Sequence, residues 1–214
     1  MKKKYNDAEL PIYEIVVDDT DQTGIRLISI VDNPAIELKG VAFNENGPVK
    51  EYKFKAQEDK QIIVGPAMIP NMKIKRKDED GNYYYNIFSK DTIYKLVQKF
   101  NRKGGNNRIN VDHSKQMVDG YIMEDWIVED DYYDKSRHYG FDVPVGTWMV
   151  SIKIEDKNFW QNEVKDLGKF GFSIEGILGE RPIEYSSIMS INDHIDNLSD
   201  GEVFELLKKF KSKW

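Results

Sequence analysis

The sequence predicts an α+β protein built on a mostly antiparallel, closed or nearly closed β-barrel that is flanked by about three helices. Three observations favour this class. Many short apolar or alternating segments are typical of strands, whereas only three segments repeat apolar residues at helical spacing. The third observation is negative: strands and helices do not alternate regularly, so a parallel dinucleotide-binding sheet is not expected.

The first 88 residues are predicted to form strands joined by turns. The apolar run at residues 61–70 is expected to be buried and to bend at Gly65 and Pro66. An acidic turn at residues 78–82 indicates a hairpin between its flanking strands. The strands predicted here are residues 11–18, 25–31, 41–43, 51–56, 61–70, 72–76 and 83–88.

Residues 89–103 form the first predicted helix. Ser89 can accept a hydrogen bond from the first turn as N-cap, and Gly104 marks the end of the helix. Its apolar side chains recur three and four residues apart, which is the spacing of one helix face. These side chains are Ile93, Leu96, Val97 and Phe100.

The second half of the chain contains further strands and two more helices. Asp156 is the predicted N-cap of a helix over residues 156–167, and Ser199 with Glu202 form a capping box before the C-terminal helix. Residues 129–137 are charged and aromatic and are expected to form an exposed connection. The predicted strands are residues 108–111, 120–128, 147–154 and 169–176.

Composition excludes several classes of function. The 214-residue chain has no cysteine, so disulfides, thiolate metal sites and cysteine catalysis are excluded. A net charge of −6 gives no reason to expect nucleic-acid binding, and no apolar run approaches the roughly 20 residues of a membrane helix. The acidic runs lack calcium-loop spacing, so we expect neither a metal nor a cofactor.

One strand carries a serine of chemical interest. Phe170, Phe172 and Ile174 alternate onto one face of the strand, which places Ser173 and Glu175 together on the other. Glycines at 171 and 176 flank Ser173, and glycine in a strand often marks the close approach of another backbone or a ligand. Ser173 could act as a nucleophile if a base reaches it.

The base has to come from three histidines. His113 follows a short predicted strand in a polar setting and is the candidate base, although a surface histidine without function is the commoner reading of such a position. His138 lies in the charged connection, where we expect it to be merely exposed. His194 lies 21 residues after Ser173.

The order of these motifs resembles a known family. The segments Asn110–Ser114, Val145–Val150 and Gly171–Gly176 are similar to those of the prohead, or capsid-maturation, serine proteases of tailed phages. Residues 29–36 also resemble the entry segment of a phage subfamily of serine proteases. The resemblance spans roughly residues 25–178. It implies a fold like that of the herpesvirus assemblins, with His113 as general base and Ser173 as nucleophile.

The third catalytic residue has three candidates under this resemblance. Related proteases place a carboxylate or a second histidine after the serine, which ranks His194 first, Asp193 second and Glu175 third. An oxyanion loop near an arginine is also implied, and Glu180 with Arg181 lie at the matching place. A plain turn explains that segment equally well.

The resemblance also implies a biological role. We expect a serine endopeptidase that cleaves the scaffold protein and the extensions of the major capsid protein inside the assembling prohead, in the host cytoplasm. Self-cleavage and a homo-oligomer are compatible with this role, and no nucleic acid, membrane or cofactor is implied. The alternative is a non-catalytic head or scaffold-associated protein on the same fold.

The corresponding domain division has three parts. Residues 1–60 would form N-terminal strands and an extension packed on the barrel, residues 61–198 the protease-like barrel, and residues 199–214 an amphipathic helix.

Overall fold

The computed structural model describes residues 10–20, 22–31, 55–57, 60–166 and 171–183. The chain divides into two compact units, residues 1–181 and 182–214, and nearly all described residues belong to the first. The expected strand at residues 41–43, most of the one at 51–56 and the expected C-terminal helix lie outside the described residues. The division at residues 60 and 198 stays a prediction.

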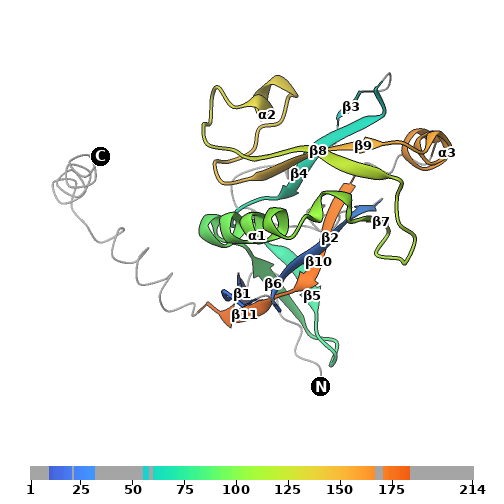
Figure 1. The fold of residues 1–214 in the computed structure, drawn as a ribbon. Helices are drawn as coiled ribbons and strands as arrows, with labels where there is room; N and C mark the ends of the chain where they lie inside the picture. Colours follow the sequence, from blue (N-terminus) through green and yellow to red (C-terminus); the bar gives the residue numbers. More distant parts are fainter. Residues whose placement is uncertain (1–9, 21, 32–54, 58–59, 167–170, 184–214) are drawn as a thin grey trace. The chain divides into compact units, whose positions relative to one another are not determined.

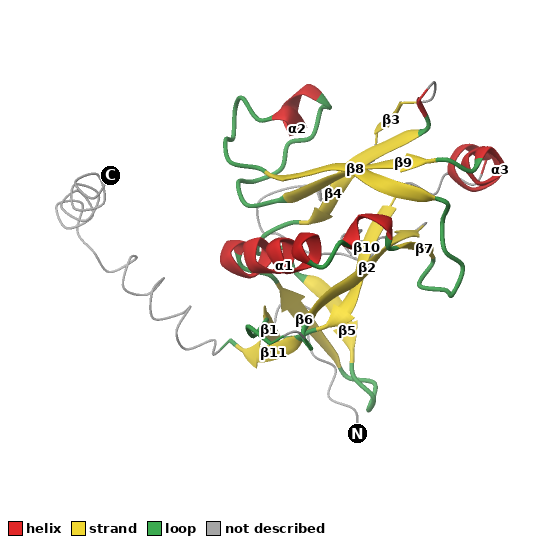
Figure 2. Ribbon diagram, viewed as in Figure 1, coloured by secondary structure: helices red, strands yellow, loops and turns green. Residues whose placement is uncertain are grey.

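The described strands form three sheets (Figures 1 and 2). In order across each sheet, the first contains β11 (Gly179–Pro182), β1 (Ile12–Val16), β6 (Tyr83–Ile87) and β5 (Ile74–Lys77). The second contains β10 (Gly171–Ile177), β2 (Gly24–Val31) and β7 (Ile109–Val111). The third contains β3 (Lys55–Gln57), β4 (Ile62–Met68), β9 (Trp148–Ile154) and β8 (Gly120–Ile127).

The predicted closed or nearly closed antiparallel barrel is therefore wrong. Each of the three sheets ends in two strands that have a single neighbour among the described residues, so none of them closes on itself. Two pairs, β1 with β6 and β2 with β7, also run parallel. The alternation of apolar residues within a strand shows which face is buried, but it does not show which distant strand lies alongside. The sequence pattern therefore predicted most of the described strands, though not β11, and predicted their closure incorrectly.

Most individual elements agree with the sequence pattern. The hairpin of β5 and β6 is confirmed. Strand β4 is buried along its whole length, and its register against β9 shifts between Pro66 and Met68, next to the expected bend. Helix α1 (Lys90–Arg102) begins after Ser89, whose side chain accepts a hydrogen bond from the Thr92 amide as expected of an N-cap.

Two helical segments differ from expectation in detail. The helix expected from Asp156 starts as α3 (Lys157–Phe159) and continues as a π-helix over Trp160–Asp166. The charged connection expected at 129–137 contains a short helix, α2 (Lys135–His138), which Asp134 caps through the Ser136 amide. A 3-10 turn, Gly105–Asn107, follows α1.

The main core lies between α1 and the sheets. Helix α1 packs on β2 and β9 (Figure 1). Phe100 of α1 meets Trp148 of β9 edge to face, with ring centroids 5.6 Å apart. Phe172 of β10 is fully buried in the same cluster. Burial of Phe172 fixes which face of β10 is turned inward, and hence the face on which Ser173 lies.

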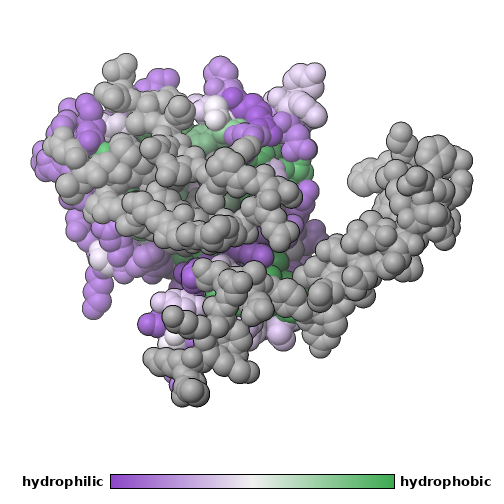
Figure 3. Space-filling model, turned by 180° about the vertical axis from the view of Figure 1, so that it is seen from behind, coloured by the Kyte–Doolittle hydropathy of each residue, from purple (hydrophilic) through white to green (hydrophobic). Residues whose placement is uncertain are grey.

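The second face of β9 belongs to a smaller cluster. Met149 packs there with Ile62 and Val64 of β4, while its neighbours Trp148 and Val150 point into the main core. Seen from behind, the described surface is mostly hydrophilic, with hydrophobic residues showing between the polar ones (Figure 3). Within the described residues, no helix has both the length and the hydropathy needed to span a membrane.

Candidate active site

Strand β10 brings Ser173 next to a second serine. Ser173 pairs with Ser29 of β2 in the antiparallel register, and the register shifts between Glu175 and Gly176. A Cβ at Gly176 would lie 2.3 Å from the carbonyl oxygen of Gly24, closer than a real side chain can approach. The close backbone approach expected at the glycines beside Ser173 is therefore confirmed at Gly176.

A row of polar residues crosses the middle of this sheet. Ser29 pairs with Ser173 on one side and, in the parallel register, with Asn110 of β7 on the other. All three are buried, with exposed fractions of 0% for Ser29, 1% for Asn110 and 5% for Ser173. A buried polar group without a partner is costly, and Glu175 provides an acceptor for Ser29 and Asn110.

His113 is directed over this row by an unusual turn after β7. Asp112 and His113 have φ values of 47° and 55°, in the left-handed region that Asp and His enter more readily than most residues. The Asp112 amide donates to the carbonyl of Ile30 at 3.0 Å, which ties the turn to β2 one residue beyond Ser29. Backbone strain of this kind often occurs at functional sites.

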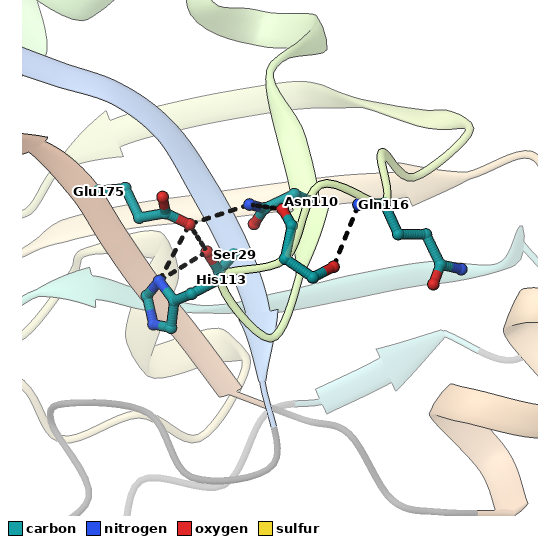
Figure 4. Close-up of polar contacts among 6 residues, drawn as sticks. Ser29, Asn110, His113, Gln116 and Glu175 are labelled. Carbon is teal, nitrogen blue, oxygen red and sulfur yellow. Dashed lines mark hydrogen bonds and ion pairs between the residues drawn. The ribbon is translucent and has the colours of Figure 1, made fainter.

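Glu175 connects these residues (Figure 4). Its Oε1 atom accepts a hydrogen bond from Ser29 Oγ at 2.7 Å and another from Asn110 Nδ2 at 2.9 Å. The same oxygen lies 3.0 Å from His113 Nδ1. Asn110 also donates to the Ser114 carbonyl at 2.8 Å, so both of its amide hydrogens are used. One carboxylate oxygen thus contacts side chains from β2, β7 and the turn that follows β7.

The network determines which nitrogen of His113 carries the proton. Ser29 Oγ lies 3.2 Å from Nδ1, but its hydrogen is already donated to Glu175. Ser29 can therefore only accept from His113, and Glu175 can only accept as well. Nδ1 must hold the proton, which leaves the lone pair on Nε2. His113 is a base through Nε2.

The environment keeps Glu175 ionised. Burial alone raises the pKa of this carboxyl, but the hydrogen bonds from Asn110, Ser29 and His113 outweigh it, and the pKa falls below the ordinary value of 4.5. A carboxylate that remains charged at neutral pH can hold Nδ1–H and stabilise the imidazolium formed when Nε2 takes up a proton.

Ser173, His113 and Glu175 line one open pocket of about 760 Å³. The side chains of His113 and Glu175 are 46% and 32% exposed, so both are accessible to a ligand. No hydrogen bond joins Ser173 to His113 within the described structure; His113 contacts Ser29 instead. The sequence-predicted pair is thus brought to one pocket without being in direct contact.

The remaining predicted residues are placed differently. His194 and Asp193 lie outside the described residues. Glu180 lines the pocket, whereas Arg181 forms an ion pair with Glu14; both belong to strand β11 rather than to a loop. His138 is exposed at the end of α2, as expected. Glu175, the one candidate for the third residue that lies among the described residues, contacts His113.

Ser29 and Asn110 were not assigned a role from the sequence. Both lie in segments that carried the family resemblance, and Ser29 is a single serine in an apolar strand, as Ser173 is. This shared pattern is a usable signal. It could not show that the two strands pair in the register that places both serines side by side.

No group of three or more His, Asp or Glu side chains in the described residues is arranged to hold a metal ion. The site instead combines a serine, a histidine with a free Nε2 and a carboxylate on Nδ1, which are the groups used in nucleophilic acyl transfer.

Comparison with known proteins agrees with this chemistry. A family model described as "Putative phage serine protease XkdF" matches residues 50–181, a range that includes Asn110, His113, Ser173 and Glu175 but not Ser29. No curated protein and no solved structure matches the chain, so the expected similarity to the assemblin fold is not confirmed. Because the match covers more than half of the 214 residues, the chain belongs to this phage serine protease family.

Proposed function

We propose that this protein is a serine endopeptidase of phage head maturation, with Ser173 as nucleophile, His113 as general base and Glu175 as the carboxylate that orients the base. The observation that carries the proposal is the 3.0 Å contact between Glu175 Oε1 and His113 Nδ1 in the pocket that Ser173 lines. This contact leaves Nε2 available for the proton of a nucleophile.

The reaction follows from these roles. Ser173 Oγ attacks the scissile carbonyl carbon, and its proton passes to His113 Nε2 while Nδ1–H remains bound to Glu175. When the tetrahedral intermediate collapses, the C–N bond breaks and the proton on Nε2 passes to the leaving amine. Water then attacks the acyl carbon and loses a proton to Nε2. When the ester C–O bond breaks, that proton passes to Ser173 Oγ and the carboxylic acid product leaves.

Ser29 is the other serine that could be considered, and its surroundings argue against it. Its side chain is fully buried, so a substrate carbonyl cannot reach Oγ. Its proton is donated to Glu175, a carboxylate with a lowered pKa and hence a weak base. Ser29 therefore supports the carboxylate, while Ser173 lines the pocket. Substrate binding has to bring Nε2 into hydrogen-bond reach of Ser173, since such contacts are often long in free enzymes.

The biological part of the proposal rests on the family. The substrates are the scaffold protein and extensions of the major capsid protein, cut inside the assembling prohead in the host cytoplasm. Self-cleavage and assembly into a homo-oligomer are compatible with that setting. Membership of a phage serine protease family supports this role.

Two measurements test the proposal. A fluorophosphonate probe should add one covalent label to the protein at Ser173, located by peptide mass spectrometry, and the label should be lost in Ser173→Ala and His113→Ala. Co-expression with scaffold and capsid proteins should give cleavage products with the wild type only, measured as intact masses. Labelling of Ser29 would mean that Ser29 of β2, rather than Ser173, is the nucleophile. Absence of labelling together with identical fragment patterns in all three proteins would favour the non-catalytic head protein.

A further inference from the structure

The pocket beside Ser173 carries two arginines. Arg26 of β2 and Arg76 of β5 both line it, and both are exposed. No hydrogen bond or ion pair joins either guanidinium to another described residue. Their donors are therefore available within this part of the structure. A guanidinium offers paired N–H groups that match a carboxylate in geometry and charge.

The carboxylates of the same pocket are already engaged elsewhere. Glu175 Oε1 is occupied by Ser29, Asn110 and His113. Glu180 Oε1 accepts from Asn86 Nδ2 at 2.8 Å and from the Tyr84 hydroxyl at 3.3 Å. These bonds hold both carboxylates in place, while the two arginines line the same pocket. The pocket thus offers two guanidinium groups beside its carboxylates, although the whole chain carries a net charge of −6.

The sheet register gives the distance of this subsite from the nucleophile. Ser173 pairs with Ser29, and Arg26 lies three residues before Ser29 on the same strand, opposite the shift in register at Glu175 and Gly176. At about 3.3 Å per residue, Arg26 is about 10 Å along the sheet from the serine pair. An extended substrate covers that distance in about three residues.

We propose that Arg26 and Arg76 form a subsite that selects peptides with an acidic side chain about three residues from the scissile bond. This inference rests on the proposed protease function. The substrates are then acidic peptides, which the two arginines select and Ser173 cleaves. Because the partners are exposed charges, selection weakens as salt screens them.

Direct binding tests the subsite without requiring turnover. The Ser173→Ala protein is titrated into two fluorescein-labelled decapeptide pools that differ only in containing Glu and Asp or Gln and Asn, and anisotropy gives the affinity. The acidic pool should bind about tenfold more tightly at low salt, and the difference should disappear when Arg26→Gln and Arg76→Gln are combined. Arg102→Gln, an exposed arginine on α1, is the matched control and should leave the preference unchanged.

The outcomes separate the two proposals. Equal affinity for both pools, or a preference that survives the double arginine substitution, overturns the subsite. Fluorophosphonate labelling of Ser173 reports the protease independently of peptide charge. Labelling with no acidic preference therefore removes the subsite alone, whereas an acidic preference without labelling supports the subsite as a peptide-binding site and removes the catalytic role of Ser173.

Discussion

Strands β2 and β10 each carry one serine at the same level of the sheet, yet the two serines have different surroundings. Ser29, on the central strand, is fully buried and donates its proton to Glu175. Ser173, on a strand with one neighbour among the described residues, lines the pocket. Residue type and strand pattern are alike at the two positions, so the difference comes from the neighbours of each serine in space.

The largest difference in peptide cleavage is expected between the Ser173→Ala and Ser29→Ala variants. Ser173→Ala should reduce peptide cleavage by about 10⁴-fold or more, because no other group can form the acyl ester. Ser29→Ala should cost about tenfold, since it removes one of the donors to Glu175. Initial rates measured on a co-purified substrate compare them. Equal losses of activity in both variants would show that the serines of β2 and β10 do not differ in role.

The next difference concerns the two glutamates of the pocket. Glu175→Gln should lower kcat by about 10²-fold to 10⁴-fold, because the amide cannot stabilise a protonated His113 as a carboxylate does. Glu180→Gln, which lines the same pocket without touching His113, should leave kcat within about threefold. If Glu180→Gln were the more damaging change, the third catalytic residue would have to be assigned again.

The contact between the strands can be disturbed directly. Gly176→Ala places a methyl group against the Gly24 carbonyl and should lower the free energy of unfolding by about 1–3 kcal/mol. Chemical denaturation measures this loss. Gly81→Ala, in the exposed turn between β5 and β6, tests the effect of a positive φ alone, because its Cβ meets only the end of Lys77 at 3.4 Å. A neutral Gly176→Ala variant would mean that the two serines are not held in register by this approach.

The smallest expected effect is a shift in titration. Asn110→Ala removes the hydrogen bond that contributes most to lowering the pKa of Glu175, so that pKa should rise. In the folded wild type the pKa lies below the unfolded value of 4.5, so the stabilisation is present above pH 4.5 and is lost as the pH falls through the folded pKa. In the variant, the stabilisation should be smaller and its loss should be complete at a higher pH. Carboxyl-carbon NMR titration follows it.

A second asparagine provides the control for this titration. Asn82 donates to Asp78 at 3.0 Å and lowers the pKa of that carboxyl. Asn82→Ala should raise the pKa of Asp78 and leave Glu175 unchanged. An unchanged Glu175 titration in Asn110→Ala would contradict the network in Figure 4.

Local signals predicted much of the fold. The spacing of Ile93, Leu96 and Phe100 predicted α1, and Ser89 predicted where it begins. The strand predicted over residues 147–154 corresponds to β9. The prediction of a closed barrel was wrong because the pairing of distant strands, such as parallel β2 and β7, depends on contacts that a local sequence pattern does not show.

The same limit applies to the site. Sequence reasoning selected His113, Ser173 and Glu175, and all three line one pocket. Under the family resemblance Glu175 ranked below His194, which lies outside the described residues, so that ranking stays a prediction. The sequence alone did not show that Glu175 contacts His113, which lies 62 positions earlier. Ser29 and Asn110 were not assigned a role because the pairing of β10, β2 and β7, which brings them to the site, cannot be read from the sequence.

The spread of these residues along the chain has a consequence for the nascent protein. Ser29 and Glu175 are separated by 146 positions and Ser29 and His113 by 84. Contacts between such distant residues form only once the intervening chain has been made and folded. A protease whose base is oriented by β2, β7 and β10 together has no complete catalytic centre until Glu175 has been synthesised. The segments made before Glu175 are thereby spared while they are still unfolded.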